Sequence, residues 1–464
     1  MTVPLTRDAL AARTGIDADA APVRIVHLGL GHFFRAHQAW YTARSVDAAE
    51  WGIAAFTGRS AGIADTLQGQ DGLFALVERG AEGDGVEIVT SLVEARPGTD
   101  TARLVELVAD PAVAVITLTV TESGYRLTPD GTPDLGDAAL AADLEVLRGG
   151  SSADRGPQTA LGRLVLALDA RRRADAGPIA VVSCDNIPGN GAFVRRGATA
   201  LAEAIDPALA DWMRTEVSFV STSVDRITPH GDESPGAVAD AGWEDHAAVV
   251  TEPFADWVLA GDFPAGRPEW ESAGARFVDD IEPWEHRKLW LLNGAHSILT
   301  FAGLPRGLET VADATADAHC RALVEAFWSE AVQCLPAGTE HVHYREQLIE
   351  RFSNPRIVHR LSQIAAEATV KAQFRFAAVA ERSVAAGRDA EGSLQALGTW
   401  IAWVLDGPSA PDARADEVAA AAASIDPVRS LLGLVSPMLA ADTVAVARVR
   451  AAASLRPTLA RRAS

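Results

Sequence analysis

The fold is set by one stretch near the start of the chain, Arg24-Ile-Val-His-Leu-Gly29-Leu-Gly31-His-Phe-Phe34-Arg35. Its first half is a β-branched run that predicts a short buried strand over Val23–Leu28. Gly29 and Gly31 then allow the backbone to approach a pyrophosphate, and the helix that follows offers N–H donors and a positive dipole. A strand, a Gly-x-Gly turn and a helix in this order predict the first unit of a dinucleotide-binding α/β domain.

The usual fingerprint has a third glycine, and Phe34 stands at its position. The place of the turn, after the first strand of an α/β domain, still favours cofactor binding over a plain tight turn. The candidate cofactor-binding residues are Gly29, Gly31, Phe34, Arg35, Arg59 and Asp71.

The second strand ends without the acid that usually accepts hydrogen bonds from the adenosine ribose. It reads Ala55-Phe56-Thr57-Gly58-Arg59-Ser60, so Arg59 and Ser60 can hold a 2′-phosphate, which favours NADP. An arginine that stacks on adenine, or that is simply solvated, fits the same residues equally well. The choice between NAD and NADP therefore stays open.

Strand and helix signals alternate along the first part of the chain and then give way to helices. Strand-like runs lie at Val23–Leu28, Gly52–Phe56, Val86–Thr90, Val113–Thr121, Ile179–Cys184, Val217–Ser221 and Ala275–Asp279. Helical spacing covers Ala36–Ala48, Thr101–Val108, Ala138–Leu147 and Ala160–Arg173, and later Trp284–Phe301, Ala312–Leu335, Arg345–Phe352, Pro355–Ala366, Leu394–Leu405 and Ala413–Ala423. We predict a doubly wound Rossmann-type domain over residues 1–280 and a mostly α-helical domain over residues 281–464.

The composition restricts the partners and the location of the protein. A formal net charge of −21 repels phosphate backbones and anionic lipid, which argues against nucleic acid and membranes as partners. The N-terminal residues carry acids and arginines where a signal peptide needs an apolar run, so we expect a cytoplasmic protein. The three cysteines are scattered, so we expect neither disulfides nor a structural metal site.

The most informative stretch is Glu285-His-Arg-Lys288-Leu-Trp-Leu-Leu-Asn293-Gly-Ala-His296. On an α-helix, at about 100° per residue, its polar residues Glu285, Lys288, Asn293 and His296 fall within one arc of roughly 140°. Oxidation of an alcohol needs a base for the hydroxyl proton and donors for the alkoxide. Lys288 can be the base if its surroundings lower its pKa. Asn293 can donate to the oxyanion, His296 can orient a second hydroxyl, and Glu285 can relay the proton. An amphipathic surface helix with incidental charges is the alternative.

Other dehydrogenase chemistries fit less well. None of the three tyrosines has a lysine four residues later, so the Tyr-x-x-x-Lys pair of short-chain dehydrogenases is absent. His341-Val-His343 resembles a metal pair on a strand but lacks a third ligand nearby. We therefore predict a zinc-independent enzyme with no bound metal.

With Lys288, Asn293 and His296 at this spacing, the sequence resembles the mannitol dehydrogenase family, polyol-specific long-chain dehydrogenases that include hexuronate reductases. Further matching motifs are Gly29-Leu-Gly31-His-Phe-Phe-Arg35-Ala-His37-Gln38, Gln70-Asp71-Gly72, Thr119-Val-Thr-Glu122-Ser-Gly124-Tyr125, Ser183-Cys-Asp185-Asn186-Ile-Pro188, Val224-Asp225-Arg226, Glu252-Pro-Phe-Ala-Asp-Trp257 and Arg351-Phe-Ser-Asn354-Pro355.

The resemblance implies that Lys288 is the acid/base catalyst and that Asn186 and Asn293 form the oxyanion hole. Asn186 also follows the predicted strand Ile179–Cys184, at the sheet edge where ligands of such folds bind.

The resemblance further implies that His296 and Asp225 lie near the substrate and that Glu285 and Glu122 line a proton path. It also implies NAD as the usual cofactor.

The chain departs from the family where members often carry an Asp-Gly-Ser-x-Lys/Arg-like segment, because here the stretch is Glu367-Ala-Thr369-Val-Lys371, followed by Arg375. Lys371 and Arg375 are candidate substrate contacts.

We expect reversible oxidation of a polyol to a ketose, mannitol to fructose or an arabinitol-type pair. The alternatives are a fructuronate or tagaturonate reductase, a mannitol-1-phosphate 5-dehydrogenase and, from another class, a non-catalytic cofactor-binding protein. Either a monomer or a homodimer is compatible with the resemblance.

Overall fold

The computed structural model describes residues 2–15, 19–58, 60–149, 156–229, 235–407 and 410–454. The chain divides into two compact units, Met1–Ile281 and Glu282–Ser464.

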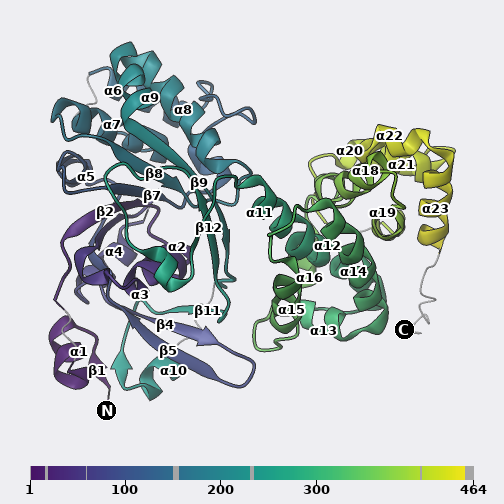
Figure 1. Ribbon diagram of the computed structural model, residues 1–464, viewed down its shortest axis with the longest axis horizontal. Helices are drawn as coiled ribbons and strands as arrows, with labels where there is room; N and C mark the ends of the chain where they lie inside the picture. The colour runs from purple at the N-terminus through teal and green to yellow at the C-terminus, as the bar shows by residue number, and fades with distance from the viewer. Residues whose placement is uncertain are drawn as a thin grey trace. The chain divides into compact units, whose positions relative to one another are not determined.

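Within the described residues, the first unit is built around an eight-stranded sheet with the order β13-β12-β9-β8-β7-β2-β3-β6 (Figure 1). Its strands are β2 (Val23–Leu28), β3 (Gly52–Phe56), β6 (Leu92–Arg96), β7 (Val115–Leu118), β8 (Ile179–Ser183), β9 (Val217–Asp225), β12 (Asp256–Ala260) and β13 (Arg276–Phe277). Neighbours from β6 to β9 are parallel, and β12 pairs with β9 antiparallel. The parallel strands have the common dinucleotide-fold order, in which the strand order reverses between β2 and β7. The predicted doubly wound Rossmann-type fold is confirmed.

Each face of this sheet has its own core because successive residues of a strand point to opposite sides. Ile25 and Ile53 belong to the core of one face, whereas Val26 and Ala54 belong to the core of the other. The first face is covered by α2 (His32–Phe34), η1 (Arg35–Ala39), α3 (Trp40–Arg44) and α4 (Gly62–Gln68). The second is covered by α5 (Thr101–Val108), α6 (Ala138–Leu147), α7 (Ala160–Arg173), α8 (Asn190–Ile205) and α9 (Pro207–Glu216).

A smaller sheet lies outside the main one and has the order β11-β4-β5. It contains an antiparallel hairpin of β4 (Phe74–Arg79) and β5 (Asp84–Val89), joined by β11 (Val249–Thr251). The strand that we predicted over Val86–Thr90 is part of this hairpin and not of the parallel sheet. β1 (Val3–Pro4) pairs parallel with β10 (Trp243–Glu244), and α1 (Arg7–Thr14) and α10 (Pro235–Asp240) are the helices next to them in the chain.

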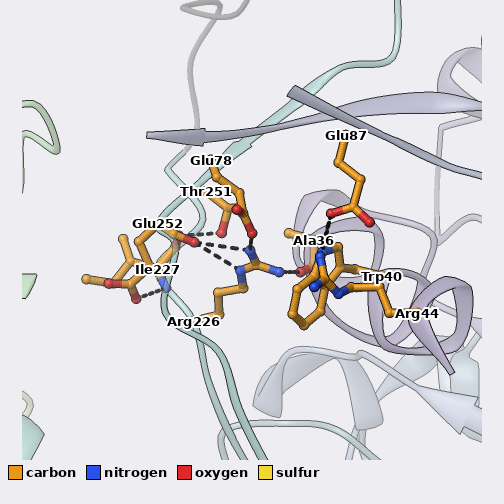
Figure 2. A network of polar contacts seen from close by, with 9 residues as sticks. All are labelled: Ala36, Trp40, Arg44, Glu78, Glu87, Arg226, Ile227, Thr251 and Glu252. Atoms are coloured by element: carbon orange, nitrogen blue, oxygen red, sulfur yellow. Dashed lines mark hydrogen bonds and ion pairs between the residues drawn. The ribbon is translucent and has the colours of Figure 1, made fainter. Parts of the chain in front are cut away.

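Arg226 joins the hairpin to the main sheet (Figure 2). Its side chain is fully buried and donates to the carbonyl of Ala36 at 2.7 Å and to Glu78 Oε1 at 2.6 Å. It also donates to the carbonyl of Glu252 at 3.2 and 3.1 Å and lies over the Trp40 ring. One buried guanidinium therefore fixes three chain segments beside the end of β9, and an unpaired charge there would be costly.

The described part of the second unit consists of helices. They are α11 (Glu282–Arg287), η6 (Lys288–Asn293), α12 (Gly294–Gly303), η7 (Leu304–Arg306), α13 (Val311–Ala316), α14 (Ala318–Ala331), η8 (Val332–Cys334), α15 (His341–Phe352), α16 (Leu361–Ile364), α17 (Ala368–Lys371), η9 (Ala372–Ala377), α18 (Ala378–Ala385), α19 (Glu391–Leu405), α20 (Ala415–Ala422), α21 (Pro427–Val435), α22 (Pro437–Ala441) and α23 (Thr443–Ser454). The predicted helical domain is confirmed. No helix in the described residues is both long enough and apolar enough to cross a membrane.

Two of the predicted helices differ in extent. Most of Pro355–Ala366 is not helical, because His359 and Leu361 pair through their backbones with Val311 and Glu309. The predicted helix Ala312–Leu335 is divided at Asp317, whose carboxylate caps the next helix.

Candidate functional site

Gly29 and Gly31 follow β2, and each is a glycine for a different reason. Gly29 has φ +116°, and a Cβ there would lie 2.1 Å from the carbonyl oxygen of Thr119 at the end of β7. A Cβ on Gly31 would meet only the Gly29 carbonyl oxygen, at 3.5 Å, which is an ordinary contact. The protein itself therefore does not require glycine at position 31, and the missing side chain leaves an open cradle that fits a diphosphate.

Gly31 borders a cavity of about 830 Å³ in the first unit. The cavity is lined by Thr2, Leu30, Gly31, His32, Arg35, Ile63, Val238, Ala239, Trp243, Glu244, Asp245, His246, Ala247 and Ala248. The segment from 243 to 248 was not recognised in the sequence, because it lies more than 200 residues from the glycine turn and carries no motif. The volume of the cavity suits a ligand of the size of a dinucleotide cofactor.

Arg35 fastens the glycine turn to this second segment. Its side chain is buried and donates to the carbonyls of Gly31, at 3.1 Å, and Ala247. Burial lowers the pKa of Arg35 to about 10, opposed by the nearby charge of Asp245. Arg35 therefore remains a cation at neutral pH, on the wall of the cavity.

Phe34 fills the position of the missing third glycine with a fully buried ring. The ring stacks on His27 of β2 with centroids 3.7 Å apart. This packing replaces the close contact of helix and strand that the glycine normally allows. The side chain of Phe34 is therefore unavailable to a cofactor, and the backbone is its remaining means of contact.

The other predicted cofactor contacts are placed away from the cavity wall or lie outside the described residues. Asp71 is exposed, and its Oδ2 accepts from the backbone N–H of Arg7 at 3.1 Å. Arg59 lies outside the described residues. At the end of β3, the carbonyls of Thr57 and Gly58 accept from Arg163 at 3.2 Å each.

Three of the predicted site residues follow parallel strands. Glu122 lies exposed in η3 (Glu122–Tyr125) after β7, and Asn186 is exposed in the turn after β8. Asp225 is the last residue of β9 and is 5% exposed. Because parallel strands end at the same edge of a sheet, all three share the edge that carries Gly29.

In the second unit, Lys288 begins a π-helical turn that ends at Asn293. Both side chains are half-buried, and His296 follows in the first turn of α12 with 7% exposure. The predicted α-helical arc is wrong in this turn, because an i→i+5 turn rotates each residue by less than an α-helix does. Glu285 lies half-buried in α11, so all four residues belong to one continuous helical segment.

A second π-helical turn, η9, carries Arg375 and packs against the first. Arg375 donates to the carbonyl of Asn293 at 2.8 Å and to Ser297 Oγ at 2.7 Å. Burial lowers the pKa of Arg375 to about 10, so it stays charged at neutral pH. The structure therefore brings this cation beside the predicted oxyanion donor of the second unit.

Lys371 points to the end of a neighbouring helix. Its Nζ donates to the carbonyls of Ile364 at 2.7 Å and Ala366 at 2.6 Å. Burial and the charge of Arg375 lower the pKa of Lys371 to about 8, and Glu367 partly opposes this. These bonds cap α16 and leave the amine fewer protons for a substrate.

His359 is a neighbour of His296 that sequence reasoning missed. The centroids of the two rings are 4.9 Å apart, and the rings are nearly perpendicular. The ring of Phe352 also packs against His296, with a centroid distance of 4.7 Å. Burial lowers the pKa of His359, which favours its neutral form. No local signal marked His359, because it lies in the extended segment that we predicted as helix.

The described residues hold no group of three or more His, Cys, Asp or Glu side chains arranged for a metal ion. His341 and His343 lie in the first turn of α15 and not on a strand.

Family models match both units. The model of the mannitol dehydrogenase Rossmann domain matches residues 23–272, and that of the mannitol dehydrogenase C-terminal domain matches residues 280–424. A D-mannonate oxidoreductase of Escherichia coli (strain K12) is 38% identical over 384 residues, which cover 80% of this chain and 78% of that protein.

Two solved structures are similar to this chain over nearly its whole length. The Pseudomonas fluorescens mannitol 2-dehydrogenase, in a ternary complex with NAD and D-mannitol, is 30% identical with a TM-score of 0.77 and covers 97% of this chain and 96% of that one. A D-sorbitol dehydrogenase in substrate-free form is 28% identical with a TM-score of 0.87, and the match covers 96% of both chains. The chain belongs to the mannitol dehydrogenase family.

Proposed function

We propose that this chain is a zinc-independent polyol dehydrogenase that uses NAD to interconvert a linear polyol and its ketose, such as mannitol and fructose or an arabinitol-type pair. One observation carries the proposal: the likeness, over 97% of this chain, to a mannitol 2-dehydrogenase solved with NAD and D-mannitol. On this proposal, residues 1–280 bind the cofactor and residues 281–464 supply the catalytic lysine.

NAD, when bound, accepts the hydride that leaves the alcohol carbon. The cradle at Gly31, the N–H groups of the helix that begins at His32 and the charge of Arg35 support a pyrophosphate there. The backbone of Phe34 and the carboxylate of Asp71 remain proposed contacts. NADP stays a second possibility because Arg59 and Ser60 follow β3 in the sequence.

Lys288 takes the hydroxyl proton of the substrate and starts the reaction as a neutral amine. Asn186 and Asn293 each donate an amide N–H to the oxygen that becomes negative. Neither amide competes for the proton, so transfer goes to the lysine. In the direction of reduction, Lys288 returns the proton to the same oxygen.

Substrate position and proton exit are assigned to other polar groups. His296 and Asp225 hydrogen-bond further hydroxyls of the chain-like substrate. Glu285 and Glu122 pass the proton from Lys288 to solvent.

A hexuronate reductase is the second candidate. Its support is the 38% identity to a D-mannonate oxidoreductase, together with the Arg375 guanidinium beside Asn293. A carboxylate at one end of the substrate fits that guanidinium, with Lys371 as a weaker partner.

The test is absorbance of the reduced nicotinamide with a panel of polyols, ketoses and hexuronates, each tried with NAD and NADP. We expect turnover with a polyol and ketose pair, and a loss of about 10²–10⁴-fold in kcat for Lys288→Ala with cofactor binding kept. Turnover restricted to hexuronates, lost in Arg375→Ala, would favour the second candidate. A silent panel with folded protein that binds cofactor would overturn both.

The titration of Lys288 can be observed directly, because the chain contains only two lysines, Lys288 and Lys371. Protein labelled with ¹³Cε-lysine therefore gives two ¹³Cε signals, one for each lysine. The variant Lys371→Arg lacks one of them and so identifies the signal of Lys288. We expect the Lys288 signal to titrate near neutral pH in the complex with cofactor. If the chemical shift shows that the Lys288 amine stays protonated at every pH at which the enzyme is active, Lys288 is not the base.

A further inference from the structure

The turn after β8, which carries Asn186, is tied to the end of β7 by the carboxylate of Asp185. The Asp185 side chain is 5% exposed. Its Oδ1 accepts from the backbone N–H of Val120, and its Oδ2 accepts from the hydroxyl of Tyr125. Tyr125 is itself buried and packs edge-on against Phe193 of α8. The two carboxylate oxygens thus join the loop after β7 to the turn after β8, at the same edge of the sheet as Gly29 and Asn186.

A second anchor holds the other end of the same turn. Asn190 is fully buried, and its Nδ2 donates to the carbonyls of Asp185 and Thr222, both at 2.9 Å. Its Oδ1 accepts from the backbone N–H of Thr222 at 2.9 Å. The turn is therefore fixed to β7 at Asp185 and to β9 at Asn190, with the exposed Asn186 between these two points.

We infer that Asp185 is a positioning residue that sets the orientation of Asn186 by clamping its turn to Val120 and Tyr125. The inference rests on the proposed function, in which Asn186 donates to the reacting oxygen. An oxyanion donor works only when its N–H already points to where the charge develops, so the anchor of its turn controls kcat more than substrate affinity.

The charges around the clamp allow either protonation state of Asp185. Among the described residues of the first unit, its ionisable neighbours are Tyr125 and Cys184, and burial together with the Asp185 charge raises the pKa of both well above their usual range. Burial raises the pKa of Asp185 to about 7, against the two hydrogen bonds. A protonated Asp185 keeps both contacts if its Oδ2 donates to the Tyr125 oxygen, and an asparagine reproduces that arrangement.

Three variants test the clamp, with kcat counted per molecule that binds reduced cofactor. Asp185→Ala removes both contacts, and we expect kcat to fall by up to about 10²-fold with little change in the KM for polyol. Tyr125→Phe removes one contact and should give an intermediate loss, and Asp185→Asn should restore kcat to within about threefold. Unchanged kcat in Asp185→Ala and Tyr125→Phe would overturn the inference. An equal loss in Asp185→Asn would also overturn it, because hydrogen bonding could then not be the cause.

Two measurements without turnover separate the clamp from the proposed function. Hydrogen exchange over residues 119–125 and 184–190 should speed up in Asp185→Ala but not in Asp185→Asn. Because the folded pKa of Asp185 lies above its unfolded value, the wild type loses stability from this group as pH rises from about 4 to about 7. The Tm of Asp185→Asn should therefore gain on that of the wild type across this window. If wild type shows no turnover while both measurements behave as stated, the proposed function fails and the clamp is only structural. Unchanged exchange in Asp185→Ala removes the clamp itself.

Discussion

Gly29 and Gly31 are separated by one residue, yet a methyl group should act on them in opposite ways. At position 29 it would collide with the carbonyl of Thr119 on a backbone with φ +116°, whereas at position 31 it would meet no close protein atom. We expect Gly29→Ala to lower the free energy of unfolding by about 1–3 kcal/mol. Gly31→Ala should keep its Tm and weaken the binding of NAD, as thermal melting and calorimetric titration would report. Wild-type affinity in Gly31→Ala would show that this turn is not the pyrophosphate cradle.

His27 gives a prediction about acid stability. Its ring is buried between Thr117 Oγ1 at 2.8 Å and Thr119 Oγ1 at 3.0 Å, and burial lowers its pKa to about 3. The unfolded chain binds a proton below about pH 6.5 and the folded chain does not, so this group destabilises the fold as pH falls from about 6.5 to about 3. The loss is at most about 1.4 kcal/mol per pH unit.

The variant His27→Gln should therefore lose less Tm than wild type between about pH 7 and about pH 4. A reference measurement near pH 8, where the imidazole is neutral in both states, isolates the packing effect of the substitution. Parallel curves for the two proteins would contradict the assignment.

At the level of elements, π-helical turns coincide with the predicted site segments of the described chain. They are η1 (Arg35–Ala39), η6 (Lys288–Asn293) and η9 (Ala372–Ala377). Each π turn accommodates one residue more than an α turn, and such turns are frequent at functional sites. Neither helix propensity nor hydrophobic spacing distinguishes an i→i+5 turn from the α-helix around it, so such patterns do not predict these turns.

Deletion of Leu289 should convert η6 into regular α-helix, with one residue fewer between Lys288 and Asn293 and about 100° of rotation per residue in place of the smaller rotation of the i→i+5 turn. We expect the helix content by circular dichroism and the Tm to stay near those of the wild type, while turnover of the polyol falls. Deletion of Ser329, an exposed residue in the regular helix α14, is the control. This deletion should destabilise the second unit, because a regular α-helix has no extra residue to lose and the residues after the deletion are rotated out of their packing. Full activity after the Leu289 deletion would contradict a functional role for the π turn.

Sequence reasoning located some elements well and missed others for identifiable reasons. The runs Val23–Leu28 and Gly52–Phe56 match β2 and β3 residue for residue, because most of their residues are apolar, as is usual for buried parallel strands. The hairpin strand β4 and the antiparallel β12 were missed among neighbouring apolar residues. The contacts of the candidate site that we did not predict are mostly those between segments far apart in the sequence. The contacts of Arg35 with Ala247 and of His296 with His359 depend on tertiary packing, which no local sequence pattern encodes.

At the level of the whole molecule, the net charge of −21 sets the response to salt. Repulsion among surface carboxylates opposes the compact state and is screened over about 10 Å at 0.1 M salt. We therefore expect the Tm to rise between about 20 mM and about 300 mM sodium chloride. Potassium chloride over the same range is the control and should give the same shift, because screening depends on ionic strength. A Tm that falls or stays constant with salt would show that local ion pairs outweigh the net charge.

Arg35 and Arg226 also constrain how the polypeptide acquires its shape during translation. Arg35 bonds a carbonyl 212 residues ahead of it, and Arg226 reaches back 190 residues to Ala36. A ribosome releases the glycine turn long before either partner has been synthesised. The wall of the cavity at Gly31 is therefore incomplete until Ala247 has left the ribosome, and the apolar residues of that wall stay exposed during this interval.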